Sequence, residues 1–264
     1  MAKKETYRQK HREQSGEAFV EPGERKAPVR ISEADQALFE AGVVLLIDKP
    51  LHWTSFDVVR KIRNSIRIKK VGHAGTLDPL ATGLLIVCTG KFTKKINEYM
   101  AQEKEYTGTI TLGAVTPTYD LESQPEKHTD ITGITEEQVR NMPAVFTGEI
   151  QQFPPVYSAI KKKGTPLYEL ARRGEAVELE ARNIFIKEFE ITSIEMPVVC
   201  FRIVCSTGTY IRSIAHDFGA ALGCGGYLSS LRRTRIGAFE VKDAMGMDQF
   251  AEKYNVKESL PGLE

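Results

Sequence analysis

One short segment, residues 106–112, limits what this chain can fold into. Its tyrosine, glycine, isoleucine and leucine alternate strictly with three threonines, and a period of two residues predicts a β-strand with one buried face. Two longer stretches, residues 183–193 and 198–205, and two short apolar runs, residues 43–47 and 84–88, also favour strands. A sheet is therefore expected, and the segments between its strands decide the fold class.

Helical patterns separate these strands. The clearest helix begins near Thr54 or Ser55, and its apolar positions recur every three or four residues: Phe56, Val59, Ile62 and Ile66. A second helix follows the turn at 206–209 and buries Ile211, Ile214, Ala215 and Phe218. Shorter helices are expected at 32–39, 91–100 and 135–146, and loops at 72–83 and 116–134. Because strands and helices mix without a βα repeat, the pattern predicts an α+β fold with a mixed, mainly antiparallel sheet and flanking helices.

Composition is that of an ordinary globular protein. The 264 residues are 41% hydrophobic and 27% charged, which is enough apolar material for a core without disulfides or metals. No run of about 20 apolar residues predicts a membrane span, and the first residues lack the apolar stretch of a secretory signal. None of the four cysteines forms a CxxC pair. We therefore expect a reduced, cytoplasmic protein.

Charge is unevenly distributed although the formal net charge is only +1. Residues 1–30 are rich in Lys, Arg, Glu and Gln, which predicts a disordered tail before one domain at 31–264. Six basic residues and no acidic one lie between Val58 and Gly72, and further basic clusters occur at 161–163, 172–173 and 232–235. Basic groups neutralise phosphates and nearby tyrosines can stack on bases. RNA binding and ordinary solvated faces both fit this pattern.

The segment from Gly72 to Gly83 is the densest candidate for chemistry. It contains three glycines, one proline, one histidine and one aspartate, whereas the chain has no GxxxxGK[ST] loop, no HExxH motif and no Gly-x-Ser-x-Gly elbow. The histidines and cysteines do not show zinc-ligand spacing, so no metal site is expected. A rigid loop that presents one carboxylate, Asp78, suits catalysis. The same aspartate can also simply cap the turn before Pro79.

This segment resembles the signature loop of the bacterial tRNA pseudouridine synthases that modify the T-loop uridine, position 55 of tRNA. Further segments match motifs of that family in the same order: 48–50 with 54–55, 104–106, 155–161, 167–169, 208–212 and 227–233. The similarity extends from about residue 42 to residue 250. It implies a pseudouridine synthase fold with a central RNA-binding cleft, and residues 31–264 as the catalytic domain.

The resemblance implies roles for three central residues. Asp78 would be the nucleophile that promotes cleavage of the C1′–N1 bond of a flipped uridine. The uracil would then rejoin the sugar through C5, without a cofactor. Tyr106 would stack on the base and help to remove the C5 proton, and Arg212 would pair with Asp78 and orient it. The positive charge of an arginine at a helix start interacts unfavourably with the helix dipole unless a carboxylate pairs with it. An unpaired surface position for Arg212 would therefore be unfavourable.

Further positions are implied to bind substrate. His73 would fill the space that flipped bases leave in the RNA loop, and Tyr210 and Leu231 would line the uracil pocket. Lys49 is expected to support the fold rather than the chemistry. The implied partner is the T-arm of tRNA, bound by a monomer that needs neither a membrane nor an obligate protein partner.

Members of this family usually carry a small C-terminal RNA-binding module, which we expect to be missing from a chain that ends at Glu264. Three other interpretations stay open. One is the RNA-guided synthase of archaea and eukaryotes, although Leu80 and Ala81 fit the bacterial type better. Another is an idle tRNA-binding or folding module, which would have no need of Asp78, Tyr106 and Arg212 together. The third is an N-glycosidase, which would release free uracil.

Overall fold

The computed structural model describes residues 31–158, 161–162, 164–167, 173 and 179–254. The predicted tail at residues 1–30 lies outside the described residues, as do Tyr168 of the motif at 167–169 and parts of the basic clusters at 161–163 and 172–173. All described residues belong to one compact unit.

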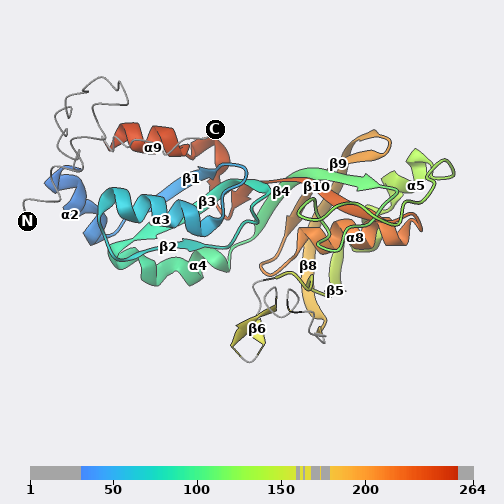
Figure 1. The fold of residues 1–264 in the computed structure, drawn as a ribbon, viewed down its shortest axis with the longest axis horizontal. Coiled ribbons are helices and arrows are strands. Elements are labelled where there is room, and N and C mark those ends of the chain that lie inside the picture. The colour runs from blue at the N-terminus through green and yellow to red at the C-terminus, as the bar shows by residue number, and fades with distance from the viewer. Residues whose placement is uncertain (1–30, 159–160, 163, 168–172, 174–178, 255–264) are drawn as a thin grey trace, which may run out of the picture. The chain divides into compact units, whose positions relative to one another are not determined.

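One sheet organises this unit (Figure 1). Among the described residues, nine strands join in the order β1-β3-β10-β4-β9-β8-β5, with β2 paired to β3 and β11 paired to β10. The strands are β1 (Val44–Lys49), β2 (Val71–Ala74), β3 (Ala81–Thr89), β4 (Lys104–Leu112), β5 (Gly148–Gln152), β8 (Arg182–Glu195), β9 (Val198–Cys205), β10 (Gly226–Ile236) and β11 (Phe239–Glu240). A separate hairpin pairs β6 (Lys161–Lys162) with β7 (Thr165–Pro166). Among the strand pairs of the described residues, only β10 and β3 pair in parallel, so the expected mixed, mainly antiparallel sheet is confirmed.

Helices pack against the strands at both ends of the sheet (Figure 1). They are α2 (Glu33–Ala41), α3 (Ser55–Ile66), η1 (Gly90–Lys95), α4 (Ile96–Met100), α5 (Glu136–Asn141), α6 (Pro143–Phe146), α8 (Ile211–Ala221), η2 (Val241–Asp243) and α9 (Met247–Lys253). Helices α2, α3 and α9 share one apolar core with β1 and β3, and η1 and α4 pack against the other side of these strands. Helix α8 packs with α5 and α6 against β4, β8, β9 and β10. None of the helices in the described residues is long and apolar enough to span a membrane.

Helix α3 forms where predicted, but its buried face differs from the prediction. Thr54 accepts a hydrogen bond from the Asp57 backbone N–H, and the Asp57 carboxylate accepts one from Thr54, which completes a capping box. Val58, Val59, Ile62 and Ile66 are buried. Phe56 is 56% exposed, so its assignment to the apolar stripe was wrong. Its ring lies on the surface beside the Arg63 guanidinium, 5.8 Å from the ring centroid.

Half of the predicted loop at 72–83 is strand. Strand β2 continues to Ala74 and β3 begins at Ala81, so only residues 75–80 form the connection. The glycines suggested a loop because they weaken strands in isolation. Gly83 has a different purpose, since its φ is 101° and a Cβ there would lie 2.3 Å from the Arg233 carbonyl oxygen. Glycine therefore lets β3 and β10 approach each other beside the Asp78 loop.

Strand β10 lies at the centre of the sheet although its sequence gave no strand signal. Its middle is polar, and the hydroxyls of Ser229 and Ser230 lie 2.8 and 2.7 Å from that of Thr109 on β4. The arginine cluster at its end has the composition of an RNA-binding patch. Instead Arg232 forms an ion pair with Asp48, and Arg233 is buried. These side chains hold the sheet together.

Candidate active site

Helix α8 brings Arg212 into the site. Ile211, Ile214 and Phe218 are buried against the sheet, and each buried apolar side chain of this size stabilises the helix position by about 1.5–3 kcal/mol. Gln152 on β5 fixes the helix start, because its side chain donates to the Tyr210 carbonyl and accepts from the Tyr210 N–H. The side chain of Arg212, in the first turn, is only 7% exposed.

Arg212 meets Asp78 across 134 residues of sequence. Its Nε lies 2.9 Å from Asp78 Oδ2 as an ion pair without hydrogen-bond alignment, and its Nη2 donates to Oδ1 at 3.4 Å. Its Nη1 donates to the Thr118 carbonyl at 3.1 Å and its Nη2 to the Tyr157 carbonyl at 3.0 Å. The Asp78 carboxylate therefore compensates the unfavourable interaction between the Arg212 charge and the helix dipole. The guanidinium is fixed from several directions.

The loop that presents Asp78 is held on both sides. Ser55 at the start of α3 donates to the Leu77 carbonyl and accepts from the Leu77 N–H, at 3.2 and 2.8 Å. The His52 N–H donates to the Pro79 carbonyl at 2.8 Å. Ala81 N–H donates to the Asp78 carbonyl itself. With its backbone groups satisfied in this way, the loop presents one carboxylate from a fixed frame.

Lys49 lies underneath this loop and is fully buried. Its Nζ donates to the carbonyls of Pro50 at 2.9 Å and Trp53 at 2.5 Å, and lies 3.5 Å from that of Pro79. Burial lowers the pKa of the Lys49 ammonium to about 8, although the nearby Asp78 charge acts in the opposite direction. These contacts agree with the expectation that Lys49 supports the fold.

A small hollow of about 20 Å³ opens beside Asp78. Leu231 of β10 lines it, together with Asp120, Leu228, Ser229 and Ser230 and with Leu80 and Ala81. The side chain of Asp78 is 36% exposed here. The geometry thus places an accessible carboxylate, paired with a buried guanidinium, next to an apolar wall. Such a pair can act on a neutral ring that enters the hollow.

Asp120 is the site residue that sequence analysis missed. Its Oδ2 lies 3.6 Å from Arg212 Nε, and its side chain is 5% exposed. Burial raises the pKa of Asp120, while Thr118 and Arg212 act in the opposite direction. The residue lies in a segment interpreted only as a polar loop, and the Thr118-Tyr119-Asp120 stretch carries no recognisable motif. Only its position beside β10, where the Leu228 N–H donates to the Tyr119 carbonyl, brings it to the site.

Tyr106 on β4 is buried, with 8% of its surface exposed. It pairs with Arg233 of β10, which donates to the carbonyls of Leu84 at 2.8 Å and Gly75 at 3.1 Å. Burial raises the pKa of the Tyr106 hydroxyl, and the adjacent Arg233 charge counteracts the rise. Arg233 thereby connects the tyrosine to both ends of the segment that carries Asp78.

His73 and Tyr210 lie at the margins of this arrangement. His73 is half-buried on β2 and pairs with Val87, and burial together with the Arg233 charge lowers its pKa. Tyr210 caps α8 and is half-buried, and burial raises its pKa. Neither of the two residues lines the hollow beside Asp78. No group of three or more His, Cys, Asp or Glu side chains among the described residues could hold a metal ion.

An α+β sheet of this topology defines the class of the protein. It is also found in a solved Cbf5-Nop10-Gar1 complex, with a TM-score of 0.63 and 30% identity over 83% of this chain and 58% of that one. An H/ACA RNP bound to a substrate RNA containing 2′-deoxyuridine gives a TM-score of 0.62 and 27% identity over 85% of this chain. The chain spans a little over half the length of those two chains, 58% of each. The expected pseudouridine synthase fold is thereby confirmed.

The chain belongs to the TruB family of pseudouridylate synthases. Residues 63–211 match "TruB family pseudouridylate synthase (N terminal domain)". The tRNA pseudouridine synthase B of Flavobacterium johnsoniae is 54% identical over 80% of this chain and 95% of its own length. That of Parabacteroides distasonis is 49% identical over 83% of this chain and 97% of its own length. The family resemblance expected from the motifs is confirmed.

Residues 212–261 match the "tRNA pseudouridylate synthase B C-terminal domain". The described part of this match contains α8, β10, β11, η2 and α9. Strand β10 lies between β3 and β4 in the main sheet, so this part belongs to the same sheet as the N-terminal match. The expectation of a missing separate module stays a prediction.

Proposed function

We propose that this protein converts the T-loop uridine of tRNA, at position 55, to pseudouridine. The observation that carries the proposal is the Asp78–Arg212 pair at 2.9 Å, open to a hollow lined by Leu231, in a chain of the TruB family. The names of the relatives from Flavobacterium johnsoniae and Parabacteroides distasonis support tRNA as the substrate. In this proposal residues 31–264 form the catalytic domain.

Asp78 acts as the nucleophile on the flipped uridine. Its carboxylate is partly exposed while Arg212 is buried, so the guanidinium holds the carboxylate from the protein side and leaves an oxygen for the substrate. Cleavage of the C1′–N1 bond frees the uracil, which rotates and rejoins the sugar through C5, and the transient bond to Asp78 breaks again. The proton lost from C5 is balanced by one gained at N1. Tyr106 stacks on the base and assists removal of the C5 proton. Its burial favours an uncharged hydroxyl.

Residues around the Asp78–Arg212 pair bind the substrate. Leu231 contacts the uracil from β10, and Tyr210 closes the pocket at the start of α8. His73 occupies the space left in the T-loop when bases flip. A hollow of about 20 Å³ has room for about one water molecule, so a uracil enters only when surrounding side chains move. The phosphates meet basic residues of α3 and of its C-terminal end, such as Arg63 and the exposed Arg67, which lie close in sequence to the Asp78 loop.

The protein acts as a monomer on the T-arm of free tRNA, without an obligate protein partner. The alternative is RNA-guided modification within a complex, which the likeness to a Cbf5-Nop10-Gar1 complex favours. We favour the stand-alone activity because the relatives named for tRNA are about 50% identical over nearly their whole length, whereas the guided structures match at 30% identity or less.

The test is to incubate the purified protein alone with an unmodified tRNA transcript and to map pseudouridine at nucleotide resolution. We expect one modified position, in the T-loop, without added protein or guide RNA. Modification that requires other components would favour the RNA-guided interpretation. Release of free uracil without pseudouridine would instead identify an N-glycosidase.

A further inference from the structure

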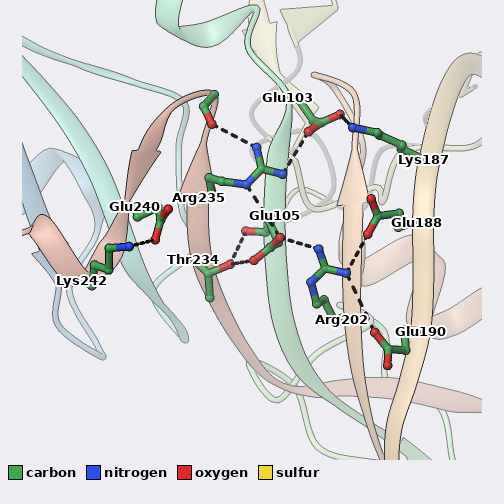
Figure 2. Close-up of polar contacts among 11 residues, drawn as sticks. Glu103, Glu105, Lys187, Glu188, Glu190, Arg202, Thr234, Arg235, Glu240 and Lys242 are labelled. Atoms are coloured by element: carbon green, nitrogen blue, oxygen red, sulfur yellow. Dashed lines mark hydrogen bonds and ion pairs between the residues drawn. The ribbon is translucent and has the colours of Figure 1, made fainter.

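A network of charged side chains joins β4, β8, β9 and β10 (Figure 2). It lies on the face of the sheet opposite Tyr106, because Glu105 and Tyr106 are neighbours in β4. At its centre, Glu105 on β4 accepts from the Arg202 guanidinium on β9 at 2.8 Å, and its Oε1 accepts from the Thr234 hydroxyl on β10, also at 2.8 Å. Arg235 lies 3.7 Å from Glu105 and pairs with Glu103 at 3.0 Å. The Glu105 side chain is 18% exposed, so these contacts are partly shielded from water.

The network coincides with an irregularity in β10. Arg233 pairs with Tyr106 and Arg235 pairs with the preceding residue, Glu105, which leaves Thr234 as an extra residue between them. Residues two apart in a regular strand point to the same face. The bulge at Thr234 instead sends Arg233 to the face of Tyr106 and Arg235 to the opposite face.

The bulge matters because Arg233 is needed on the inner face. It is fully buried and donates to the carbonyls of Gly75 and Leu84, which bracket the Asp78 loop. A one-residue slip of β10 would turn Arg233 away and leave both carbonyls without this donor. The same slip would remove the guanidinium from beside Tyr106.

Hydrogen bonds between Thr234 and Glu105 lie at the bulge, where the register of β10 against β4 shifts. The Thr234 hydroxyl lies 2.8 Å from Glu105 Oε1 and 3.3 Å from the Glu105 backbone carbonyl. Glu105 is in turn held by Arg202 from the neighbouring strand (Figure 2). The extra residue is therefore tied by its own side chain to the partner residue that it faces.

We propose that Glu105 and Thr234 are positioning residues, which act from the far face of the sheet by fixing the bulge that holds Arg233 against Tyr106 and the Asp78 loop. The inference rests on the proposed function, since it concerns residues assigned there to the reaction. It predicts that damage to this network slows the chemical step without weakening tRNA binding.

Four variants test the proposal. Thr234→Val removes the hydroxyl at nearly constant shape, and Thr234→Ser restores it. Glu105→Leu removes the central carboxylate. Glu240→Leu is the matched control. Glu240 lines a cleft of about 270 Å³ together with Glu105 and Thr234, but its carboxylate pairs with Lys242 and not with Thr234.

We expect kcat on tRNA to fall at least about tenfold in Thr234→Val and Glu105→Leu while KM stays within about twofold, since small displacements of reacting groups cost large factors in rate. Thr234→Ser and Glu240→Leu should keep kcat within about twofold of the wild type. Equal losses in Glu240→Leu, or no rescue by serine, would overturn the proposal. Should Glu105→Leu not fold, the two Thr234 variants decide the question.

Hydrogen exchange separates this inference from the proposed function. The Leu77 amide donates to the Ser55 hydroxyl and the Ala81 amide donates to the Asp78 carbonyl. Both amides should exchange at least about fivefold faster in Thr234→Val and Glu105→Leu only. This measurement needs no substrate. A wild-type protein without synthase activity would refute the proposed function, whereas unchanged exchange in both variants would refute the positioning role.

Discussion

Replacing Lys49 by methionine is expected to change how the stability of the protein depends on pH. The ammonium is fully buried beneath the Asp78 loop and donates to backbone carbonyls. Burial lowers its pKa from 10.5 to about 8. Between these pH values the unfolded chain binds a proton that the folded chain has released, so the contribution of Lys49 to stability rises with pH.

The magnitude follows from the two pKa values. The interval from 10.5 to about 8 corresponds to about 3 kcal/mol of free energy. Below pH 8 the folded protein bears this cost of burying a charge, and above pH 10.5 the cost is gone. Integrating over the interval gives about 2 kcal/mol of recovered stability between about pH 7 and about pH 9.5. Methionine carries no charge, so the Lys49→Met variant lacks this term.

The assay is urea unfolding of both proteins at these two pH values, followed by the fluorescence of Trp53, the single tryptophan of the chain. The free energy of unfolding of the wild type minus that of the variant should grow by about 2 kcal/mol toward alkaline pH. Taking the difference removes the effect of other groups, such as Cys88 and Cys205, whose pKa values burial raises to about 11. The Lys91→Met variant, which removes a lysine at an exposed site, is the control. A pH-independent difference for Lys49→Met would refute the reasoning.

Three further outcomes are expected. Asp78→Asn should abolish turnover, measured as tritium release from C5-labelled uridine in tRNA, and leave binding within a few-fold, because phosphate contacts supply most of the affinity. Arg212→Lys should lower the single-turnover rate about a hundredfold, or about 2.7 kcal/mol, because an ammonium cannot hold Asp78 and two carbonyls in one plane; a rate near that of the wild type would contradict this. Charge reversal at Arg63 and Arg67 should lower the slope of log K against log salt by about 0.7–0.9 for each lost phosphate contact, which filter binding across several salt concentrations measures. A larger effect of deleting residues 1–30 would mean that the contacting charge lies elsewhere.

Local signals in the sequence predicted most of the elements. Thr54 and Thr135 both form the capping boxes that start α3 and α5, because a cap depends only on residues within one turn. The alternation in β4 likewise reports its own burial, since Tyr106, Ile110 and Leu112 are all buried. Such patterns are decided within a few residues and need no knowledge of the rest of the chain.

Strand β10 was not predictable in the same way. Its serines and arginines are unfavourable in an isolated strand, and they are tolerated because partners distant in sequence satisfy them, such as Thr109 for Ser229 and Asp48 for Arg232. The basic cluster at 232–235 therefore has the composition of a phosphate-binding surface, but its arginines bond to carboxylates and carbonyls of neighbouring segments of the sheet. Charge patterns along a sequence do not distinguish these outcomes, because the answering carboxylates lie more than 100 residues away.

The candidate site depended even more on distant contacts. The residue pattern alone indicated that Asp78 is a loop carboxylate that could also simply cap a turn, and only the family resemblance paired it with Arg212. The structure brings the two within 2.9 Å. The catalytic roles of Asp78, Arg212 and Tyr106 stay predictions, as do the substrate-binding roles of His73 and Tyr210.

The contact between Asp120 and Arg212, which the sequence did not predict, contributes to the position of the guanidinium. One guanidinium faces two carboxylates, and their surroundings differ, since the side chain of Asp78 is 36% exposed and that of Asp120 is 5% exposed. The buried carboxylate and the carbonyls of Thr118 and Tyr157 hold Arg212 in place independently of Asp78. The guanidinium therefore does not need to follow Asp78 when that carboxylate engages a ligand, and its charge is already oriented toward the reacting group. A site arranged in this way requires Asp120 to stay beside Arg212, and a loop with no recognisable motif can supply it because β10 fixes the backbone at Tyr119.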